Sequence, residues 1–283
     1  MKIMFFQLKY DCVHGILYQW KKFVLLAVVY AVLIIDFIIR CSNKGLIGIY
    51  SIGDMVLWLF KGTKEFDIAA NNILDIPTAY ILPNILIAFI VGNYPFKDLN
   101  GFGTAVLVRT RKKMIWWISK CVWCMLSIVT AYAILISELF FVGIGSKNSS
   151  FIPTMQVCTK ILGFDKVLIE HSANFNELAI YMLIGAVLTS IAISMLQVSL
   201  SQILSPIIGY ISVVALLIAG VFFSFEAVVT NGFMTVRNGM YLSGGYNYTM
   251  IIFVDILIII VAITVGLIHF VKTDIFNKSE WRI

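Results

Sequence analysis

Three carboxylates interrupt apolar stretches of this chain and are the residues best placed to do chemistry: Asp36, Glu138 and Asp255. An ionised carboxylate in lipid is costly unless it is paired or hydrated, so such residues often mark paths for ions, protons or substrates. Asp36 has a cation four residues on, Arg40, on the same helical face. Glu138 and Asp255 have no cation nearby in sequence, and Arg237 is a candidate partner for one of them. The acids could form an outer vestibule that releases a cationic or amphipathic substrate, but interfacial placement with access to water is the favoured interpretation.

The cysteines and histidines do not indicate a metal or redox site. Cys121 and Cys124, in "CVWC", lie one helical turn apart inside an apolar stretch, which is typical of packing. Cys41 and Cys158 are both expected on the outer side of a membrane and could pair, although spacing alone does not decide this. The three histidines are scattered along the chain: His14, His171 and His269.

No motif in the sequence supplies energy or an activated nucleophile. The phosphate-binding pattern G-x-x-x-x-G-K-[ST] is absent, and "GFGTAV" (Gly101 to Val106) lacks the third glycine of a dinucleotide-binding loop. An intramembrane serine protease needs a G-x-S serine at membrane depth, and no apolar stretch contains one. We therefore expect no catalytic residue, no metal and no cofactor in this chain.

The composition indicates that lipid is part of the solvent. Of 283 residues, 60% are hydrophobic and only 13% are charged, against about 25% charged in an ordinary soluble domain. A soluble core of this size could not bury so much apolar surface, so we expect an all-α polytopic membrane protein. The net charge of +6 then matters by its location and does not indicate nucleic-acid binding.

Six apolar stretches are long enough to cross about 30 Å of hydrocarbon as helices. They are Phe23–Ile39, Ile76–Asn93, Ile115–Gly143, Leu178–Leu204, Pro206–Val229 and Met250–Val271. An amphipathic segment, residues 1–22, precedes them and is expected to lie in the membrane plane. Residues 23–283 then form a transmembrane domain of six helices.

Two prolines and two shorter apolar segments refine this expectation. Pro83 should kink the second span, and a tight turn at Ser205-Pro206 should make the fourth and fifth spans a hairpin. The segments Gly45–Phe60 and Phe151–Ile169 are shorter and carry charges. We expect both to lie on the outer surface or to dip into it.

The distribution of charge predicts the orientation of the spans. With both termini in the cytoplasm, 13 of the 21 Lys and Arg residues lie inside with four acids, and the outer segments hold eight cations and eight acids. An excess of Lys and Arg is typical of cytoplasmic loops. We therefore expect residues 94–114 in the cytoplasm and residues 40–75, 144–177 and 230–249 outside.

The most basic stretch, "LVRTRKKMIWWISK" (Leu107 to Lys120), lies at the inner mouth of the third span. Its cations are expected to contact anionic headgroups, while Trp116 and Trp117 anchor the helix at headgroup level. These cations are Arg109, Arg111, Lys112, Lys113 and Lys120.

The wider pattern "IVGNYPFKDLNGFGTAVLVRTRKKMIWWISK" joins a proline-containing span, a glycine-rich polar segment, the basic patch and the tryptophan pair. In this stretch, about Tyr94–Lys120, and in its six-span layout, the chain resembles the membrane subunits of type-2 ABC exporters. It is most similar to bacterial permeases found beside peptide-exporter and bacteriocin-immunity ATPases. The resemblance implies a permease of the bacterial cytoplasmic membrane that works as a homodimer or heterodimer. Its substrate would be an amphipathic or antimicrobial peptide or a lipid-like molecule.

The resemblance also implies that a short cytoplasmic helix, roughly Pro95 to Val106, docks on a separate ATPase subunit. Two copies of that subunit would bind the ATP and Mg. The implied contacts are Phe96, Lys97, Asp98 and Phe102, with Arg109 and Arg111 nearby. An ordinary cytoplasmic loop is the alternative, because no spacing rule marks such a helix.

Two other classes of function stay open. A secondary transporter, or the substrate-binding subunit of an uptake system, would use the three carboxylates, although no inverted repeat or pair of broken helices is visible. An intramembrane enzyme has less support because the serine motif is missing. The sequence does not decide the substrate or the direction of transport.

Overall fold

The computed structural model describes residues 2–64, 76–110, 112–145, 148–166, 175–225, 228–232, 234–240 and 245–273. Within these ranges the chain is mainly helical, and strand-type pairing is limited to an isolated bridge between Asn238 and Tyr246. The main helices are α1 (Lys2–Cys12), α2 (Trp20–Asn43), α3 (Ile52–Leu59), α4 (Thr78–Gly92), α5 (Tyr94–Leu99), α6 (Phe102–Thr110), α7 (Lys113–Gly145), α8 (Met155–Val157), α10 (Leu178–Ile203), α11 (Pro206–Phe222) and α12 (Tyr248–Lys272). Short turns of helix join them: η1 (Val13–Leu17), η3 (Cys158–Leu162), η4 (Phe175–Glu177), η5 (Val229–Asn231) and η6 (Thr235–Arg237).

Five helical segments in the described part of the chain are long and apolar enough to cross a membrane. They are Trp20–Asn43, Thr78–Leu99, Lys113–Gly145, Phe175–Ile203 and Tyr248–Lys272. The chain is therefore a multi-pass membrane protein.

The sixth predicted span is not confirmed as a span of full length. The stretch was expected to run over Pro206–Val229, but α11 ends at Phe222 after 17 residues. A helix of this length is about 25 Å long, slightly less than the thickness of the hydrocarbon. The predicted hairpin is present, because the hydroxyl of Ser205 accepts a hydrogen bond from the Ile208 amide and starts α11 at Pro206.

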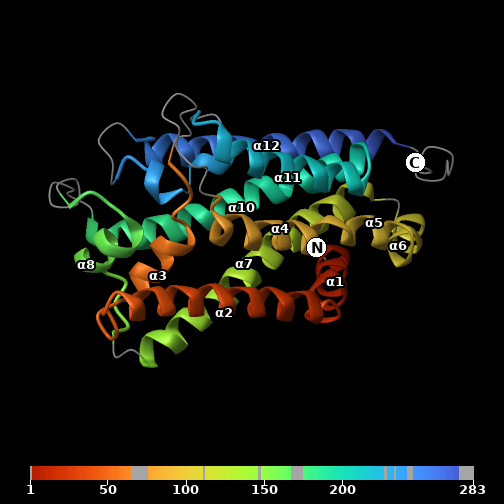
Figure 1. Ribbon diagram of the computed structural model, residues 1–283. Coiled ribbons are helices and arrows are strands. Elements are labelled where there is room, and N and C mark those ends of the chain that lie inside the picture. Colours follow the sequence, from red (N-terminus) through yellow and green to blue (C-terminus); the bar gives the residue numbers. More distant parts are fainter. Residues whose placement is uncertain are drawn as a thin grey trace.

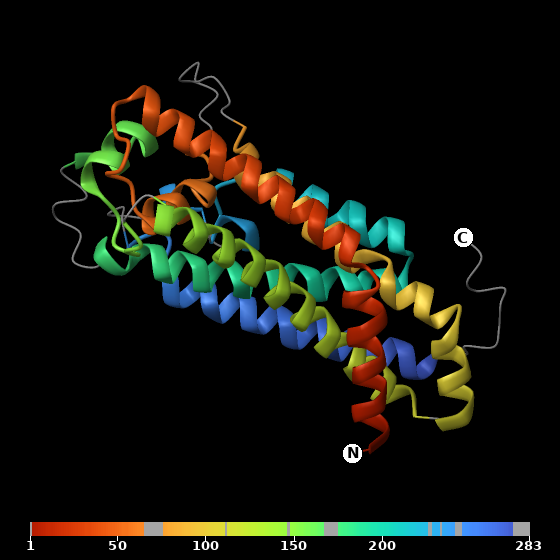
Figure 2. The same ribbon diagram turned by 90° about the horizontal axis from the view of Figure 1, so that it is seen from below.

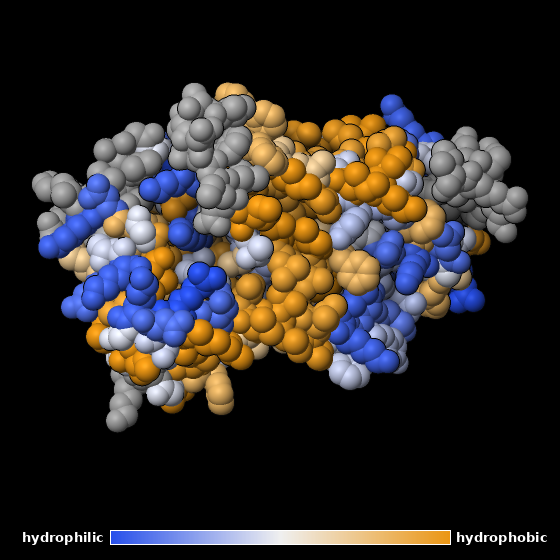
Figure 3. Space-filling view, viewed as in Figure 1, coloured by the Kyte–Doolittle hydropathy of each residue, from blue (hydrophilic) through white to orange (hydrophobic). Residues whose placement is uncertain are grey.

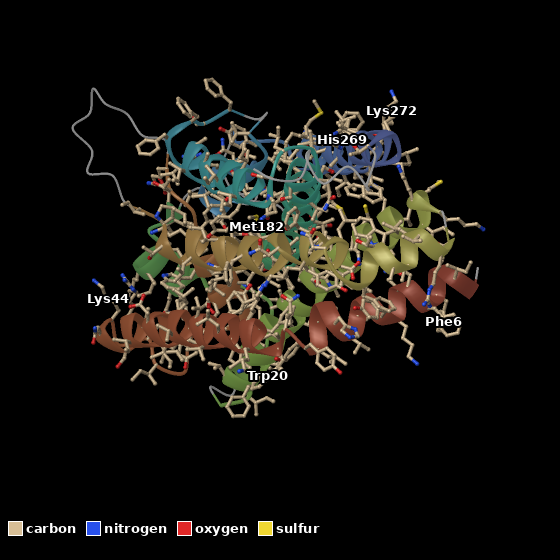
Figure 4. All side chains as sticks on the ribbon, turned by 90° about the vertical axis from the view of Figure 1, so that its right-hand side faces the viewer. Phe6, Trp20, Lys44, Met182, His269 and Lys272 are labelled. Atoms are coloured by element: carbon tan, nitrogen blue, oxygen red, sulfur yellow. The ribbon has the colours of Figure 1, made fainter. Side chains whose placement is uncertain are left out.

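Helix α10 is the central helix of the bundle. It packs against α12, α11, α7 and α4 (Figure 1). Met182, on α10, is 1% exposed and lies inside the bundle when the molecule is viewed from one end (Figure 4). Any polar side chain on α10 is thus enclosed by other helices.

The two ends of the bundle carry different elements. Helices α1, α5 and α6 lie at one end with the last turn of α12, and α3 and α8 lie at the other (Figures 1 and 2). The Lys113 ammonium donates to the carbonyls of Val271 and Thr273 at 3.0 and 2.6 Å, which fixes the end of α12 beside the start of α7. On the face seen in Figure 3, apolar surface fills the middle and hydrophilic surface gathers towards both ends.

The segment Gly45–Phe60, one of the two expected on the outer surface, has an exposed first part, in which Ile47 is 69% exposed, and a buried helix, α3. Every residue of α3 except Trp58 is buried. The Gly53 amide donates to the Ser150 carbonyl, and the Thr235 amide donates to the Phe60 carbonyl at 2.8 Å. The expectation of a surface helix is wrong for α3 because it packs against α2, α4, α7 and α10.

The second such segment, Phe151–Ile169, is partly buried over its described residues. Val157, Cys158 and Leu162 have no more than 1% of their surface exposed. Residues 167–169 lie outside the described ranges.

The N-terminal helix turns its polar side inward. Gln7 and Asp11 are 4% and 0% exposed, whereas Phe5 and Phe6 are both 68% exposed. Figure 4 shows Phe6 and Trp20 pointing away from the bundle. This is the distribution of a helix that contacts protein with its polar side and offers an apolar side to lipid.

Candidate functional site

The basic stretch of the sequence divides into exposed and buried residues. Lys112 is exposed, but Lys120 is completely buried, and Trp116 and Trp117 are 1% and 0% exposed. The expectation that Lys120 meets headgroups and that the tryptophans anchor at the membrane surface is therefore wrong. Lys120 and Trp116 point into the protein towards the buried acids Asp11 and Asp98, and the Trp117 indole donates to the Ile263 carbonyl on α12 at 3.0 Å.

Lys120 is bound by two carboxylates from different parts of the chain. Its ammonium contacts Asp11 on α1, and it lies 2.6 Å from a carboxylate oxygen of Asp98 on α5. The three side chains are 0–2% exposed. A buried ammonium is tolerated only when it is well paired, so these bonds hold α1, α5 and α7 together.

The carboxylate of Asp11 accepts several more hydrogen bonds. The Ser119 hydroxyl donates at 2.5 Å, the Tyr94 hydroxyl at 2.9 Å and the Gln7 amide at 3.3 Å. These donors come from α7, α5 and α1 itself. The lone pairs of the buried carboxylate are thus satisfied, which limits the desolvation cost of the ion pair.

Aromatic rings complete this group. The Trp116 indole donates to Asp98 at 2.9 Å, and the Lys120 ammonium lies 4.8 and 5.0 Å from the ring centres of Tyr94 and Trp116. Such cation–π contacts add stability when they are shielded from water. We call this group the Lys120 cluster: Gln7, Asp11, Tyr94, Asp98, Trp116, Ser119 and Lys120.

The residues implied as ATPase contacts fall on two sides of the α5–α6 segment. Lys97 and Arg109 are exposed, Phe102 is 52% exposed and Phe96 is half-buried. Asp98 belongs to the Lys120 cluster, so it is not available as the exposed contact that was expected. Arg111 lies outside the described residues.

The three acids considered as pathway residues lie in different surroundings. Asp36 bonds to Arg40 at 2.9 Å, as the spacing predicts, and both side chains are largely exposed. Asp255 is fully buried and accepts a hydrogen bond from Thr189 on α10. Glu138 is half-buried on α7, and its Oε2 atom has no partner among the described residues. No hydrogen bond within the described part of the chain brings the three acids together.

Arg237 was a candidate partner for Glu138 or Asp255, but the hydrogen bonds that it makes to described residues have other acceptors. Its guanidinium donates to the carbonyls of Thr63 at 2.9 Å and Gly220 at 2.6 Å, and to the side chain of Asn231. The arginine is 5% exposed. It joins the loop after α3 to the end of α11.

Sequence reasoning missed a line of polar side chains on α10. Ser190, Ser194, Gln197 and Ser201 follow each other at spacings of four, three and four residues, and each is at most 4% exposed. This spacing places them on one helical face over about 16 Å. The pattern is visible in the sequence, but hydrophobicity windows average over it. We call the contact of this face with α4 and α11 the α10 seam.

Helices α4 and α11 cover the α10 seam. The Gln197 amide donates to the Ala88 carbonyl on α4 at 2.9 Å, and Ser190 donates to Asn84 at 3.4 Å. A small cavity of about 10 Å³, the size of one water molecule, lies between the three helices. Its lining is uncharged: Asn84, Ile87, Ala88, Ser190, Ile193, Ser194, Val213 and Leu217.

Several polar atoms at and beside the α10 seam have no hydrogen-bond partner among the described residues. These atoms are the Oε1 of Gln197, the hydroxyl of Ser201 and both amide atoms of Gln202. Each such buried group costs about 1–3 kcal/mol. The α10 seam is therefore polar but incompletely bonded, unlike the Lys120 cluster.

A fourth buried carboxylate, Asp54, has only neutral partners among the hydrogen bonds of the described residues. It accepts from the Ser51 amide at 2.9 Å and the Thr154 amide at 2.8 Å, and the Cys158 thiol lies 3.6 Å away. Burial raises the pKa of the Asp54 carboxyl, and these hydrogen bonds act in the opposite direction. Asp54 thus closes the ends of two helical segments at the α3 end of the bundle.

The cysteines and histidines form no evident reactive site in the described residues. Cys41 and Cys158 are free thiols, as are the buried Cys121 and Cys124. His14 stacks on Tyr10 with ring centres 3.9 Å apart. No group of His, Cys, Asp and Glu within the described ranges could hold a metal ion, and His171 lies outside them.

The Lys120 cluster can hold helices together, and the α10 seam has the chemistry to bind uncharged polar groups. The described part of the chain shows no activated nucleophile. The chain matches no protein-family model, no characterised protein and no solved structure.

Proposed function

We propose that this chain is the membrane-spanning permease subunit of an ATP-driven exporter that works as a dimer with a separate cytoplasmic ATPase. The two-sided α5–α6 segment carries this proposal. Lys97, Phe102 and Arg109 are exposed, whereas Asp98 in the same segment is bonded to Lys120. A partner that binds the exposed side would move a segment that is ion-paired to α7 and, through Lys120, to α1.

The exposed side has the chemistry of a docking surface. The ring of Phe102 stacks on Tyr10 with centres 4.4 Å apart, so it is held in one orientation while half of its surface stays free. An oriented aromatic side chain flanked by cations suits an apolar cleft with an acidic rim. The five long apolar helices and the polar α10 seam supply the membrane part of such a transporter. An amphipathic peptide or a lipid-like molecule is the substrate class we favour.

Co-purification with the ATPase tests this proposal. The neighbouring genes would be searched for an ATPase subunit without spans, and the tagged full-length chain would be co-expressed with it. We expect Phe102→Ala and Lys97→Glu each to weaken capture about 5–30-fold, the effect of losing about 1–2 kcal/mol at an interface. The matched controls Phe6→Ala and Lys9→Glu change exposed residues of α1 and should leave capture unchanged. Normal capture by both α5–α6 variants would refute the docking surface.

The proposed orientation places both termini and the α5–α6 segment in the cytoplasm. Lys112, directly before α7, and Lys44, directly after α2, are exposed and suit cysteine labelling, because α7 begins at the α5–α6 end of the bundle and α2 ends at the α3 end. An impermeant thiol reagent added to intact cells should modify Lys44→Cys and spare Lys112→Cys. The reverse pattern would invert the proposed topology.

A proton-driven transporter is the second candidate, and Asp255 supports it. This carboxylate is fully buried, and its Oδ1 atom has no partner in the described part of the chain. Buried carboxylates within spans are common elements of proton paths. Transport by the purified chain in vesicles, driven by a pH gradient without ATP and lost in Asp255→Asn, would favour this candidate over the first.

A further inference from the structure

The α10 seam has the chemistry of a binding site. Gln197 is 0% exposed and uses its amide nitrogen on Ala88, while its Oε1 atom has no partner among the described residues. The Ser201 hydroxyl, one turn further on, is 4% exposed and likewise has no partner there. In a membrane interior a polar atom must bond within the protein, to water or to a ligand. Both atoms lie on the face of α10 that meets α4 and α11.

We propose that the α10 seam binds uncharged amide- or hydroxyl-bearing groups, such as a segment of peptide backbone. A carboxamide and a hydroxyl offer one acceptor and one donor, which are the groups that a peptide unit requires. The biological role of this binding rests on the proposed function. The inference deepens that function by naming the part of a substrate that the permease would hold.

The surroundings favour an uncharged ligand over a cation. The small cavity in the α10 seam is lined by apolar residues together with Asn84, Ser190 and Ser194, and none of its lining residues is ionisable. The buried carboxylate of Asp255, on α12, accepts a hydrogen bond from Thr189 of α10, and Thr189 lies outside this face. A cation in this seam would have no charge to offset its desolvation, whereas an amide would replace lost water contacts with Gln197 and Ser201.

Two glycines let the neighbouring helices close on these polar side chains. A Cβ atom at Gly92 on α4 would lie 2.6 Å from the Gln197 amide nitrogen. One at Gly209 on α11 would lie 2.2 Å from the Ser201 hydroxyl and 2.9 Å from the Gln197 carbonyl. Small residues permit this close approach without interlocking side chains. The α10 seam is thus closed by direct contact of backbone with polar groups, and separating the helices exposes a row of free hydrogen-bonding atoms.

Cysteine labelling of the purified full-length chain in proteoliposomes, without any ATPase, tests the proposal. The probe is methyl methanethiosulfonate, a small neutral thiol reagent. We expect Ser194→Cys to react at least tenfold faster than Ala192→Cys, which is also fully enclosed but lies on another face of α10. Acetyl-trialanine-amide should slow the reaction at Ser194→Cys at least threefold, and tetramethylammonium at the same concentration should not. Equal rates at the two positions, or protection by the ammonium ion alone, would overturn the proposal.

A pair of serine variants separates binding from packing. Ser201→Ala removes a hydroxyl without a described partner, so the melting temperature should stay level or rise while protection of Ser194→Cys by the peptide is lost. Ser199→Ala removes a hydroxyl that donates to the Ala262 carbonyl at 2.5 Å, so it should lower the melting temperature and keep protection. Protection that survives Ser201→Ala would refute the assignment.

These measurements need no ATPase, so they separate the two proposals. A chain that captures no ATPase but shows peptide protection would lose the proposed function and keep the binding site. A chain that captures the ATPase but shows no protection would lose only the binding site.

Discussion

The Lys120 cluster and the α10 seam are both polar regions buried in one apolar bundle, and they differ in how completely their groups are bonded. In the Lys120 cluster, Asp11 alone accepts from Lys120, Ser119, Tyr94 and Gln7. In the α10 seam, two polar atoms on one turn of helix have no described partner. A satisfied ionic group fixes helices in place, whereas an unsatisfied neutral group is available to a ligand. We infer that the first region holds the structure and the second does the binding.

The largest effect should come from removing the cation of the Lys120 cluster. Lys120→Met leaves Asp11 and Asp98 buried together without their counter-ion, which should cost about 3–5 kcal/mol of folding free energy. Thermal unfolding in detergent measures the loss. Lys112→Met, at an exposed position, is the matched control and should have little effect. Combining Lys120→Met with Asp11→Asn and Asp98→Asn should recover part of the stability, and a triple variant less stable than Lys120→Met would contradict a structural ion pair.

A smaller loss is expected from the hydroxyl that joins α5 to α1. Tyr94→Phe keeps the ring but removes the 2.9 Å hydrogen bond to the Asp11 carboxylate. A hydrogen bond to a charged group contributes about 1.5–3 kcal/mol. The melting temperature should fall, and cleavage of α1 by a protease added at that end should speed up. Unchanged stability would show that the Lys120 ammonium alone satisfies Asp11.

The same substitution, Gln to Leu, should change the stability in opposite directions in the Lys120 cluster and beside the α10 seam. Gln7→Leu removes a donor to Asp11 in the Lys120 cluster and should destabilise the protein by about 1 kcal/mol. Gln202→Leu, beside the α10 seam, removes two amide atoms without described partners and should stabilise it by a similar amount. Parallel melting curves test this contrast. Two changes of the same sign would remove the distinction between a satisfied and an unsatisfied region.

The smallest effect concerns Asp54, a buried carboxylate that has no cation among its recorded partners. Burial raises its pKa, so the folded state holds the proton more tightly than the unfolded state does. Stability from this group should therefore fall as the pH rises above about 4 and level off above the folded pKa. Asp54→Asn should be less stable overall because it loses an acceptor, but it should lack this pH dependence. A wild-type curve parallel to that of the variant would contradict the raised pKa.

Several features of the fold could be predicted from local sequence. Apolar length identified the five long helices, because a span in lipid must bury its backbone within one continuous helix. The turn at Ser205-Pro206 and the Asp36–Arg40 pair followed from short-range rules of capping and helical spacing. The turn and the ion pair depend on residues within four positions of each other, and each span depends on one continuous stretch, so the sequence contains the information that they need.

The errors have a common cause. Trp116, Trp117 and Lys120 were expected at the membrane surface because tryptophans and lysines usually lie there. They are buried because other segments reach them: Asp11 on α1 binds Lys120, Asp98 accepts from Trp116, and the Ile263 carbonyl on α12 accepts from Trp117. In the same way, α3 is buried because distant segments cover it. Composition predicts which environment suits a residue on average, and it does not state which partner reaches it.

The sequence by itself determined that this protein lies in a membrane, that it is helical, and where most of its spans begin and end, because length and hydrophobicity control these properties locally. Tertiary structure alone decided which polar residues are satisfied. Asp98 and Gln197 both lie in or beside predicted spans, yet one is bound by Lys120 and the other has an acceptor with no partner among the described residues. That difference depends on whether a donor from another helix lies within about 3 Å. Only the packing of α1, α4, α7, α10 and α11 sets such distances.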